Sequence, residues 1–339
     1  LERAAARGYR FNLGVEPEFF VYRRDALPDL VPLAVNPALY PTPCYDAEPS
    51  LDSIGFLERL SSYMADTGFG LFSFDQEGGD GQYEFDFAYD EALAMCDRLT
   101  LFRLMLRQTA KEFDAVATFM PKPSSTSWGS GAHMNMSIES LETGENLFRE
   151  DVEGGAKEWT KLSRAFLAGV IAHAPALAAL TTPNVNSYKR LVGSLHDGSI
   201  SWAPIWAAWG SNNRSCMMRV PGNRPALENR AVDASANMYL ATAFTLAAGL
   251  EGIERQLDPG DPVTEATYEW DHRAREWNGR LRLPRTLLEA IEAFEADPLT
   301  AEVFRPGFVA DYLDMKHREW ESYNSQVTEW ERDRYFLNA

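Results

Sequence analysis

FNLGVEPEFFVY (residues 11–22) places two glutamates, Glu16 and Glu18, inside an otherwise apolar segment. Residues i and i+2 of a β-strand point to the same face, so both carboxylates are expected on one side of a strand. Three later segments repeat this spacing with other polar pairs: Gln82 and Glu84, His133 and Asn135, and Glu228 and Arg230. We expect the four strands to surround one water-filled cavity whose side chains suit divalent cations and a phosphate-bearing substrate.

The remaining patterns predict an α+β fold. QYEFDF (82–87) alternates strictly, and GAHMNMSI (131–138) does so nearly as well, which is typical of strands. Periodic apolar residues and end signals predict several helices, at 50–68, 90–113, 156–180, 235–257, 285–297 and about 308–333. These strands and helices lack regular βαβ alternation, which favours an antiparallel sheet backed by helices. Pro17 predicts either an edge position for its strand or an irregularity beside a site.

Charge and composition exclude some functions. The chain has 339 residues, enough for one large domain or two smaller ones, and a formal net charge of -18. That charge argues against a nucleic-acid partner, because non-specific binding needs clustered lysine and arginine. The three cysteines, Cys44, Cys96 and Cys216, fit no zinc spacing, so a reducing, cytoplasmic setting is expected.

No membrane partner is expected either. The longest apolar stretch, residues 165–180, is interrupted by His173 and Pro175 and is too short to span a bilayer, so it predicts a buried helix. There is no signal peptide, and the chain begins with Leu1, so an N-terminal portion is expected to lie outside this sequence.

Each candidate site residue also has an ordinary structural interpretation. A Glu-x-Glu pair is usually a solvated face, but the apolar neighbours of Glu16 and Glu18 favour a metal site. Glu77 and Glu84 bracket a glycine-rich loop, which is either a hairpin with incidental acids or a device that brings both carboxylates to one ion. His133 follows two glycines that allow close approach of a ligand, although a lone histidine is more often structural.

Four arginines accompany the acidic segments: Arg190, Arg214, Arg219 and Arg230. Surface arginine is the ordinary interpretation. The planar guanidinium nevertheless matches carboxylate and phosphate geometry better than a lysine does. In a chain this acidic, arginines beside carboxylate-rich segments favour an anionic substrate.

The motifs together resemble one family. GVEPEFF, DGQYE, GSGAHMNMS, NSYKRL, NNRSCMMRVP and ENRAVDASANMYLATAFTLAAGLEGI occur in the same order as in the catalytic domain of glutamine synthetases, and the resemblance extends from about residue 11 to 335. It implies one catalytic domain over residues 1–339, with a curved antiparallel sheet that forms a funnel and a helical C-terminal part at about 285–335. The small N-terminal β-grasp domain expected of the family is not in this chain.

The resemblance also implies an activity: ATP-dependent ligation of the glutamate γ-carboxylate to an amine through γ-glutamyl phosphate, with two or more Mg²⁺ or Mn²⁺ ions. It implies the following roles: Glu18, Glu77 and Glu84 for the first metal; Glu16, His133 and Glu228 for the second; Asn135, Ser137, Arg214 and Arg219 for ATP; Gly129, Arg190 and Arg230 for glutamate; and Arg190, Arg214 and Arg219 for catalysis. Homo-oligomeric rings, often dodecamers, are expected from the same source. A non-catalytic relative is the competing interpretation, which the complete set of metal ligands disfavours.

The departures from the family pattern concern the amine. After KRL the chain is six residues longer, and Trp202 stands where the family has the glutamate that accepts a proton from ammonium. Trp128 and Ala226 replace a common asparagine and a frequent arginine. This pattern resembles the γ-glutamylmethylamide and γ-glutamylanilide synthetase branch, so we expect an alkyl- or arylamine larger than ammonia. His196 or Asp197 in the inserted loop is a candidate replacement base, which keeps ordinary glutamine synthesis as the alternative.

Overall fold

The computed structural model describes residues 1–34, 44–151, 157–193 and 202–337. Its strands are β1 (Tyr9–Arg23), β2 (Leu71–Gln76), β3 (Gln82–Phe87), β4 (Asp90–Glu91), β5 (Ala115–Thr118), β6 (Ala132–Ser140), β7 (Arg149–Asp151), β8 (Lys157–Trp159), β9 (Trp209–Ser211), β10 (Met218–Val220), β11 (Leu227–Asn229), β12 (Glu276–Trp277) and β13 (Arg280–Leu281). The α-helices are α1 (Glu2–Ala5), α2 (Ala47–Asp52), α3 (Ile54–Asp66), α4 (Ala92–Glu112), α5 (Lys161–Ala172), α6 (Ala174–Thr181), α7 (Ser187–Arg190), α8 (Met238–Glu254), α9 (Leu287–Ala296), α10 (Pro298–Val303), α11 (Pro306–Asn324) and α12 (Glu329–Tyr335). Two short 3₁₀ helices, η1 (Arg24–Ala26) and η2 (Thr267–Glu269), complete the set.

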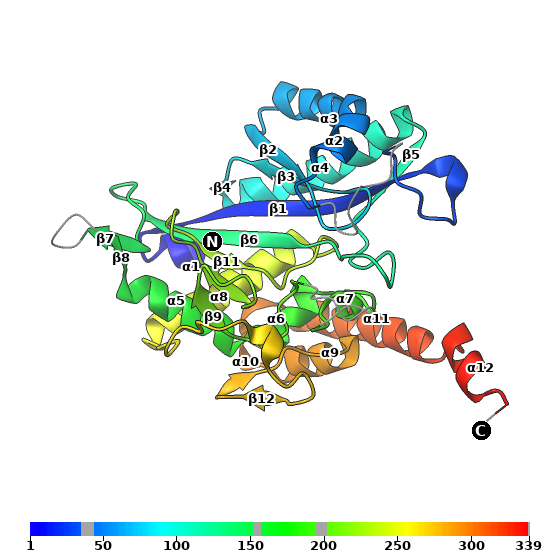
Figure 1. Cartoon of the computed structure of the whole chain (residues 1–339). Helices are drawn as coiled ribbons and strands as arrows, with labels where there is room; N and C mark the ends of the chain where they lie inside the picture. The colour runs from blue at the N-terminus through cyan, green and yellow to red at the C-terminus, as the bar shows by residue number, and fades with distance from the viewer. Residues whose placement is uncertain (35–43, 152–156, 194–201, 338–339) are drawn as a thin grey trace.

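One large sheet organises the chain. Its main order is β2-β3-β1-β6-β11-β10-β9, with β4 and β5 also paired to β1. The strands β1 and β6 lie side by side through the middle of the molecule (Figure 1). Most pairings are antiparallel, but β9 and β10 are parallel. The α+β class is confirmed, and the sheet is mixed rather than purely antiparallel.

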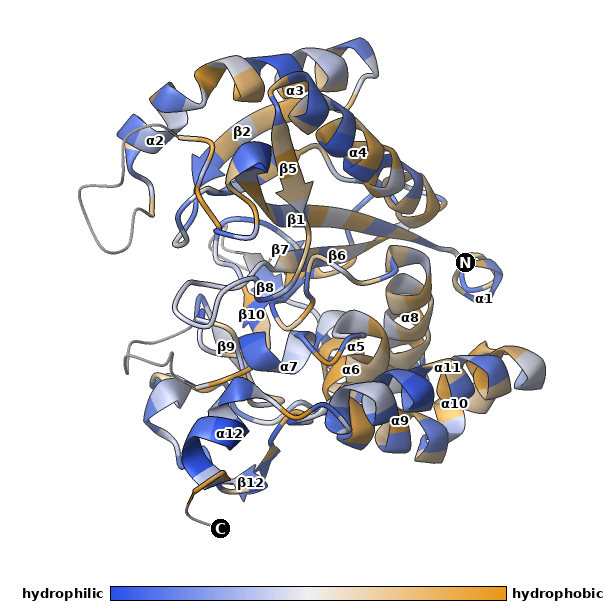
Figure 2. Cartoon of the chain, turned by 90° about the vertical axis from the view of Figure 1, so that its right-hand side faces the viewer, coloured by the Kyte–Doolittle hydropathy of each residue, from blue (hydrophilic) through white to orange (hydrophobic). Residues whose placement is uncertain are grey.

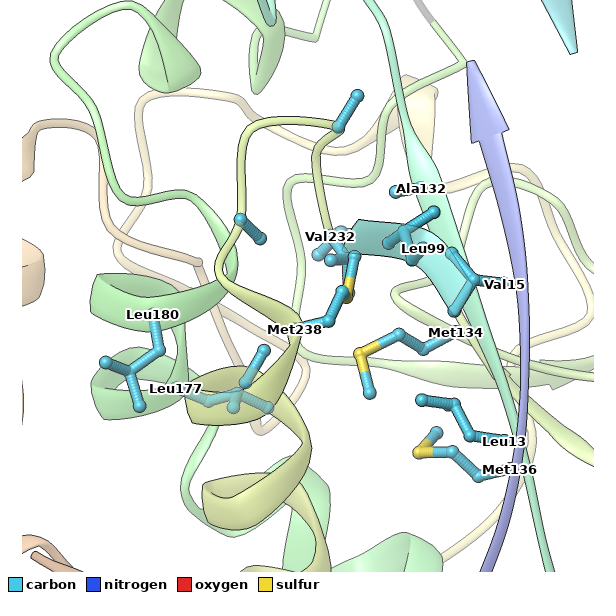
Figure 3. Close-up of a cluster of buried hydrophobic side chains, with 14 of the residues drawn as sticks. Leu13, Val15, Leu99, Ala132, Met134, Met136, Leu177, Leu180, Val232 and Met238 are labelled. Carbon is cyan, nitrogen blue, oxygen red and sulfur yellow. The ribbon is translucent and has the colours of Figure 1, made fainter. Parts of the chain in front are cut away.

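The sheet has one apolar face and one polar face, because side chains alternate along each strand. Leu13 and Val15 of β1 and Met134 and Met136 of β6 are almost completely buried. They lie toward Met238 of α8 in a single cluster (Figure 3). The intervening residues of the same strands point to the opposite face, where the polar pairs predicted from the sequence lie.

Two groups of helices cover the apolar side. The helix α4 packs against β1 and β5, and Phe102 of α4 meets Phe19 of β1 at a centroid distance of 5.9 Å. The helices α5, α6 and α8 pack below β6 (Figure 1) and carry hydrophobic faces toward the interior (Figure 2). The helices α5 and α8 approach closely at Gly169 and Gly252, where a Cβ on Gly169 would lie 2.1 Å from the Ala248 carbonyl oxygen.

Several sequence-based expectations require correction. The segment 156–180 is not one helix: residues 157–159 form β8, and α5 and α6 are separated at His173 and bent by 75°. The C-terminal helix predicted at about 308–333 is divided into α11 and α12. In the described part of the chain, no single helix is long and apolar enough to cross a membrane. The bent pair of α5 and α6 reaches that length and apolar composition only when the two helices are taken together. Pro17 does not mark an edge strand, because β1 is internal and pairs with β6 through Pro17 and with β3 from Glu18. The alternative, an irregularity beside a site, agrees with this change of partner.

Candidate active site

A polar cavity of about 250 Å³ opens on the polar face of the sheet. Residues from six strands (β1, β2, β3, β6, β10 and β11) and several loops line it, and most of them are acidic or basic. The sequence-predicted residues among them are Glu16, Glu18, Glu77, Glu84, Gly129, His133, Arg190, Trp202, Arg214, Arg219, Glu228 and Arg230. The structure therefore brings every described member of the predicted metal and glutamate sets into one place.

Strand register explains how residues far apart in the sequence meet. Glu16 of β1 is directly opposite His133 of β6, and Glu18 is opposite Glu84 of β3. On the other side of β6, Asn135 is opposite Glu228 of β11. Directly paired residues on one face have Cβ atoms about 4.5–5.5 Å apart, so the pairing alone gathers these groups.

His133 lies at the centre of the carboxylates. Its Nδ1 is 3.3 Å from Glu16 Oε2 and 3.9 Å from Glu228 Oε1, and its Nε2 is 3.7 Å from Glu18 Oε1. One ligand atom each from Glu16, Glu84 and His133 lies within 4.8 Å of the others. This trio takes members from both of the metal sets implied by the sequence.

Backbone and amide donors hold Glu18 in place. Its Oε2 accepts hydrogen bonds from the Gly131 backbone N–H at 2.7 Å and from Gln82 Nε2 at 2.8 Å. Gly131 has no room for a side chain, because a Cβ there would lie 2.8 Å from Glu18 Oε1 and 3.0 Å from His133 Nε2. The expected need for glycine beside a ligand is met at this position.

Crowding of carboxylates changes their ionisation in opposite directions. Burial and the charge of Glu18 raise the pKa of Glu77 to about 8, and burial and the charge of Glu16 raise the pKa of Asp86 to about 7. The pKa of Glu84 is also well above its ordinary value because of burial and the charges of its acidic neighbours. For Glu16, burial acts against ionisation, but the hydrogen bond and charge of His133 outweigh it and lower the pKa to about 2. Converging oxygen ligands that repel one another in this way fit hard divalent cations.

The opposite wall of the cavity is basic. Glu228 is fully buried, and its two oxygens accept hydrogen bonds of 2.6 Å from Arg219 Nη1 and Arg230 Nη1. Burial acts to raise the pKa of Glu228, but the Arg230 and His133 charges lower it. Arg190 is a buried lining residue that donates to the carbonyls of Ala231 and Arg230, whereas Arg214 is exposed to solvent.

The two remaining residues predicted for ATP, Asn135 and Ser137, line an adjoining cavity of about 460 Å³. Its lining includes exposed aromatic residues, Phe72 and Tyr89. Glu16, Asp86 and Arg224 line both cavities, so the two spaces share a wall. Arg214 and Arg219 line the first cavity.

The two tryptophans that depart from the family pattern meet at the first cavity. Trp128 and Trp202 contact edge to face, with ring centroids 4.9 Å apart and an interplanar angle of 89°. Trp128 packs on the glycine-rich loop, where a Cβ on Gly78 would lie 2.5 Å from its Cδ2. The candidate bases His196 and Asp197 lie outside the described residues.

Sequence reasoning assigned no role to several cavity residues: Tyr45, Asp75, Asp86, Asn223 and Arg224. Asp86 could have been predicted from the sequence, because it follows Glu84 by two positions and therefore lies on the same face of the strand. Asp75 could have been found only from the hairpin register, which places it opposite Glu84. Arg224 lies in the turn PGNRP between β10 and β11, where nothing local distinguishes it from a solvated arginine.

The raised carboxyl pKa values predict an unusual dependence of stability on pH. Glu77, Glu84 and Asp86 bind protons more tightly in the folded than in the unfolded chain, so the metal-free protein loses stability as pH rises from about 5 to 8. We expect the melting temperature without metal to fall by about 5 °C or more over this range. Saturating Mg²⁺ removes most of the fall, because an ion stabilises the ionised carboxylates.

His173 also makes the protein less stable as the pH rises. Burial acts against a charge on His173, but hydrogen bonds to Asp297 and Glu251 outweigh it and raise its pKa, so its stabilisation is also lost as pH rises. The Mg²⁺-dependent difference between two calorimetric series therefore isolates the cavity carboxylates. Parallel curves with and without Mg²⁺ would contradict the proposed metal cluster.

Comparisons with known proteins agree with this geometry. The family model described as "Glutamine synthetase, catalytic domain" matches residues 1–335. A curated protein named glutamate–methylamine ligase, from Methyloversatilis universalis, is 40% identical over 335 residues, covering 99% of this chain and 74% of that protein. A glutamine synthetase from Rhizobium leguminosarum bv. phaseoli is 36% identical over 332 residues, covering 97% and 74%.

Solved structures give the same result. A structure described as a GmaS/ADP complex superimposes with a TM-score of 0.88 at 36% sequence identity, covering 99% of this chain and 75% of that chain. A structure described as apo GmaS gives a TM-score of 0.87 at 37% identity, covering 100% and 75%. These values confirm the fold expected from the sequence motifs.

Proposed function

Because the chain belongs to the glutamine synthetase catalytic-domain family of ATP-dependent carbon–nitrogen ligases, we propose that it joins the γ-carboxylate of glutamate to a primary amine larger than ammonia. Ligation of glutamate to an amine at the expense of ATP is the activity that the family and the relatives support. The identity of the amine rests on the two tryptophans of the first cavity.

The acidic half of the cavity fits two divalent ions. We assign Glu18, Glu77 and Glu84 to one ion, and Glu16, His133 and Glu228 to the other. When bound, these ions neutralise charge on the phosphoryl group that passes from ATP to glutamate. Glu18 is already oriented by Gly131 and Gln82, and its Oε1 faces His133, so this ligand needs little rearrangement.

The arginines provide the rest of the electrostatic environment. Arg214 and Arg219 line the cavity where a transferring phosphoryl group would carry its charge, and Arg219 retains a buried Nε without a hydrogen-bond partner. Arg230 and Arg190, next to Gly129, form the part assigned to glutamate. A guanidinium that holds a carboxylate in place supplies orientation before any bond is formed.

We place the nucleotide in the adjoining cavity, which Asn135 and Ser137 line. Its apolar surface suits a purine base, and its polar end shares Glu16 and Arg224 with the acidic cavity. This arrangement would direct the terminal phosphate toward the glutamate residues and arginines of the first cavity.

The edge-to-face contact of Trp128 and Trp202 is the observation that carries the amine assignment. Ammonium is charged at neutral pH, and it needs a carboxylate that attracts it and accepts a proton before it attacks. The indole of Trp202 does neither. An alkyl- or arylamine gains from packing against this pair of indole rings, and an arylamine is already neutral.

A panel of amines tests this function. With full-length protein, glutamate, ATP and Mg²⁺ or Mn²⁺, we expect ADP release with methylamine, isopropylamine or aniline to have a kcat/KM at least about ten-fold above that with ammonium. Ordinary glutamine synthesis predicts the opposite order. Absence of turnover with every amine would instead favour a non-catalytic relative. Assembly into rings follows from the family alone and remains a prediction.

A further inference from the structure

Arg224 occupies an unusual position between the two cavities. Its Nη2 donates hydrogen bonds to Asn135 Oδ1 at 2.7 Å and Glu16 Oε1 at 3.0 Å, and it lies 3.4 Å from Glu228 Oε2. One guanidinium nitrogen thus contacts residues of β6, β1 and β11. Two of these residues, Glu16 and Glu228, are proposed ligands of one metal ion.

The turn that carries Arg224 is anchored on both sides. Upstream, Arg149 Nη2 donates to the Pro221 carbonyl at 2.8 Å, and the Gly222 N–H donates to Asn212 Oδ1 at 3.0 Å. Downstream, Asn146 Nδ2 donates to the Pro225 carbonyl at 3.1 Å. The backbone is therefore fixed, and the long arginine side chain, 39% exposed, is the part that can move.

The guanidinium has donors that the present contacts leave unused. Its Nε is buried and has no hydrogen-bond partner. Among the described residues that line the adjoining cavity, Arg224 is the one cationic side chain, since Ala226 stands where the resemblance gives a frequent arginine. A polyphosphate placed in that cavity would need a cation at this position.

We infer that Arg224 exchanges partners between the metal-free and the nucleotide-bound enzyme. Without metal, its charge neutralises Glu16 and Glu228 in place of the ion. A divalent ion bound to these carboxylates would repel the guanidinium. The Arg224 side chain would then rotate, while its backbone stays in place, and donate hydrogen bonds to the nucleotide phosphates. Arg224 is thereby a competitor of the metal and a ligand of the nucleotide. This inference rests on the nucleotide position given above.

Removal of the charge is expected to change two affinities in opposite directions. Arg224→Gln should bind Mn²⁺ about three- to ten-fold more tightly in the absence of nucleotide, because the competing cation is gone. The same variant should bind ADP about ten-fold more weakly at saturating Mn²⁺, because a charge-assisted hydrogen bond to phosphate is lost. Titration calorimetry measures both affinities, and a purely structural role for Arg224 would weaken both.

Two further variants complete the test. Arg318→Gln removes an equal charge from an exposed pair with Asp314 on α11 and should change neither affinity. Arg224→Lys keeps the charge but loses Nε, so Mn²⁺ binding should stay within about two-fold while ADP binding still weakens a few-fold. Weaker Mn²⁺ binding by Arg224→Gln, or unchanged ADP binding in both Arg224 variants, overturns the inference. Neither titration requires turnover, so failure of the amine panel would leave these results interpretable.

Discussion

Glu84→Gln is expected to lower the kcat for ADP release by about a thousand-fold, with weaker binding of one metal ion. Glu84 belongs to the trio whose ligand atoms lie within 4.8 Å of one another. An amide oxygen keeps the size of the side chain but removes the negative charge that holds a hard cation. The expected loss is of the order found when one preorganised electrostatic group is removed, about 10²–10³.

The same substitution should stabilise the metal-free protein. Burial and acidic neighbours raise the pKa of Glu84 far above its ordinary value, so an uncharged group removes repulsion. We expect the melting temperature without metal to rise by about 2–4 °C at pH 8, while activity falls. Glu295→Gln, an exposed position on α9, is the matched control and should change neither quantity. Wild-type rates and metal titrations in Glu84→Gln would show that the ligand assignment is wrong.

The second large effect concerns the amine. Trp202→Glu is expected to raise kcat/KM for ammonium by about ten-fold and to lower it for aniline by about as much, a change in selectivity of about 100-fold. The new carboxylate would attract ammonium and accept its proton. The substitution also removes the indole ring, whose centroid lies 4.9 Å from that of Trp128. An aromatic amine would lose its contact with this ring.

Two comparisons make this result specific. Trp202→Phe keeps an aromatic ring without a carboxylate, so it should retain the preference for larger amines. Trp128→Ala removes the partner ring and should reduce aniline use without improving ammonium use. If ammonium is the best substrate of the unaltered enzyme and Trp202→Glu does not increase its use, the assignment of a larger amine fails.

Much of the site could be predicted from the sequence because it lies on strands. The alternation in QYEFDF and GAHMNMSI predicts which side chains share a face of the strand. The structure places Gln82, Glu84 and His133 in the cavity, as expected. The order of six motifs then indicates which strands belong together. Patterns of this kind need no knowledge of long-range contacts.

Other features depend on tertiary contacts that no local pattern encodes. The bend at His173 is one of these, because His173 is held between Glu251 of α8 and Asp297, which precedes α10, residues 78 and 124 positions away. Arg224 is another, since its role is defined by Glu16, 208 positions away in the chain. The internal position of Pro17 also follows from strand pairing rather than from the residue itself.

The strands β1 and β6 supply hydrophobic core from one set of positions and cavity side chains from the alternate set. The role of each side chain is therefore set by whether its position along the strand is odd or even. Insertion of one residue at the start of β6 would exchange the two sets along the rest of the strand, turning His133 and Asn135 toward the core and Met134 and Met136 toward the cavity. Insertion of two residues at the same place would restore the alternation but shift the pairing of His133 with Glu16 by two positions along β1. Changes of chain length are therefore better tolerated in the connections between strands, such as the short PGNRP turn between β10 and β11.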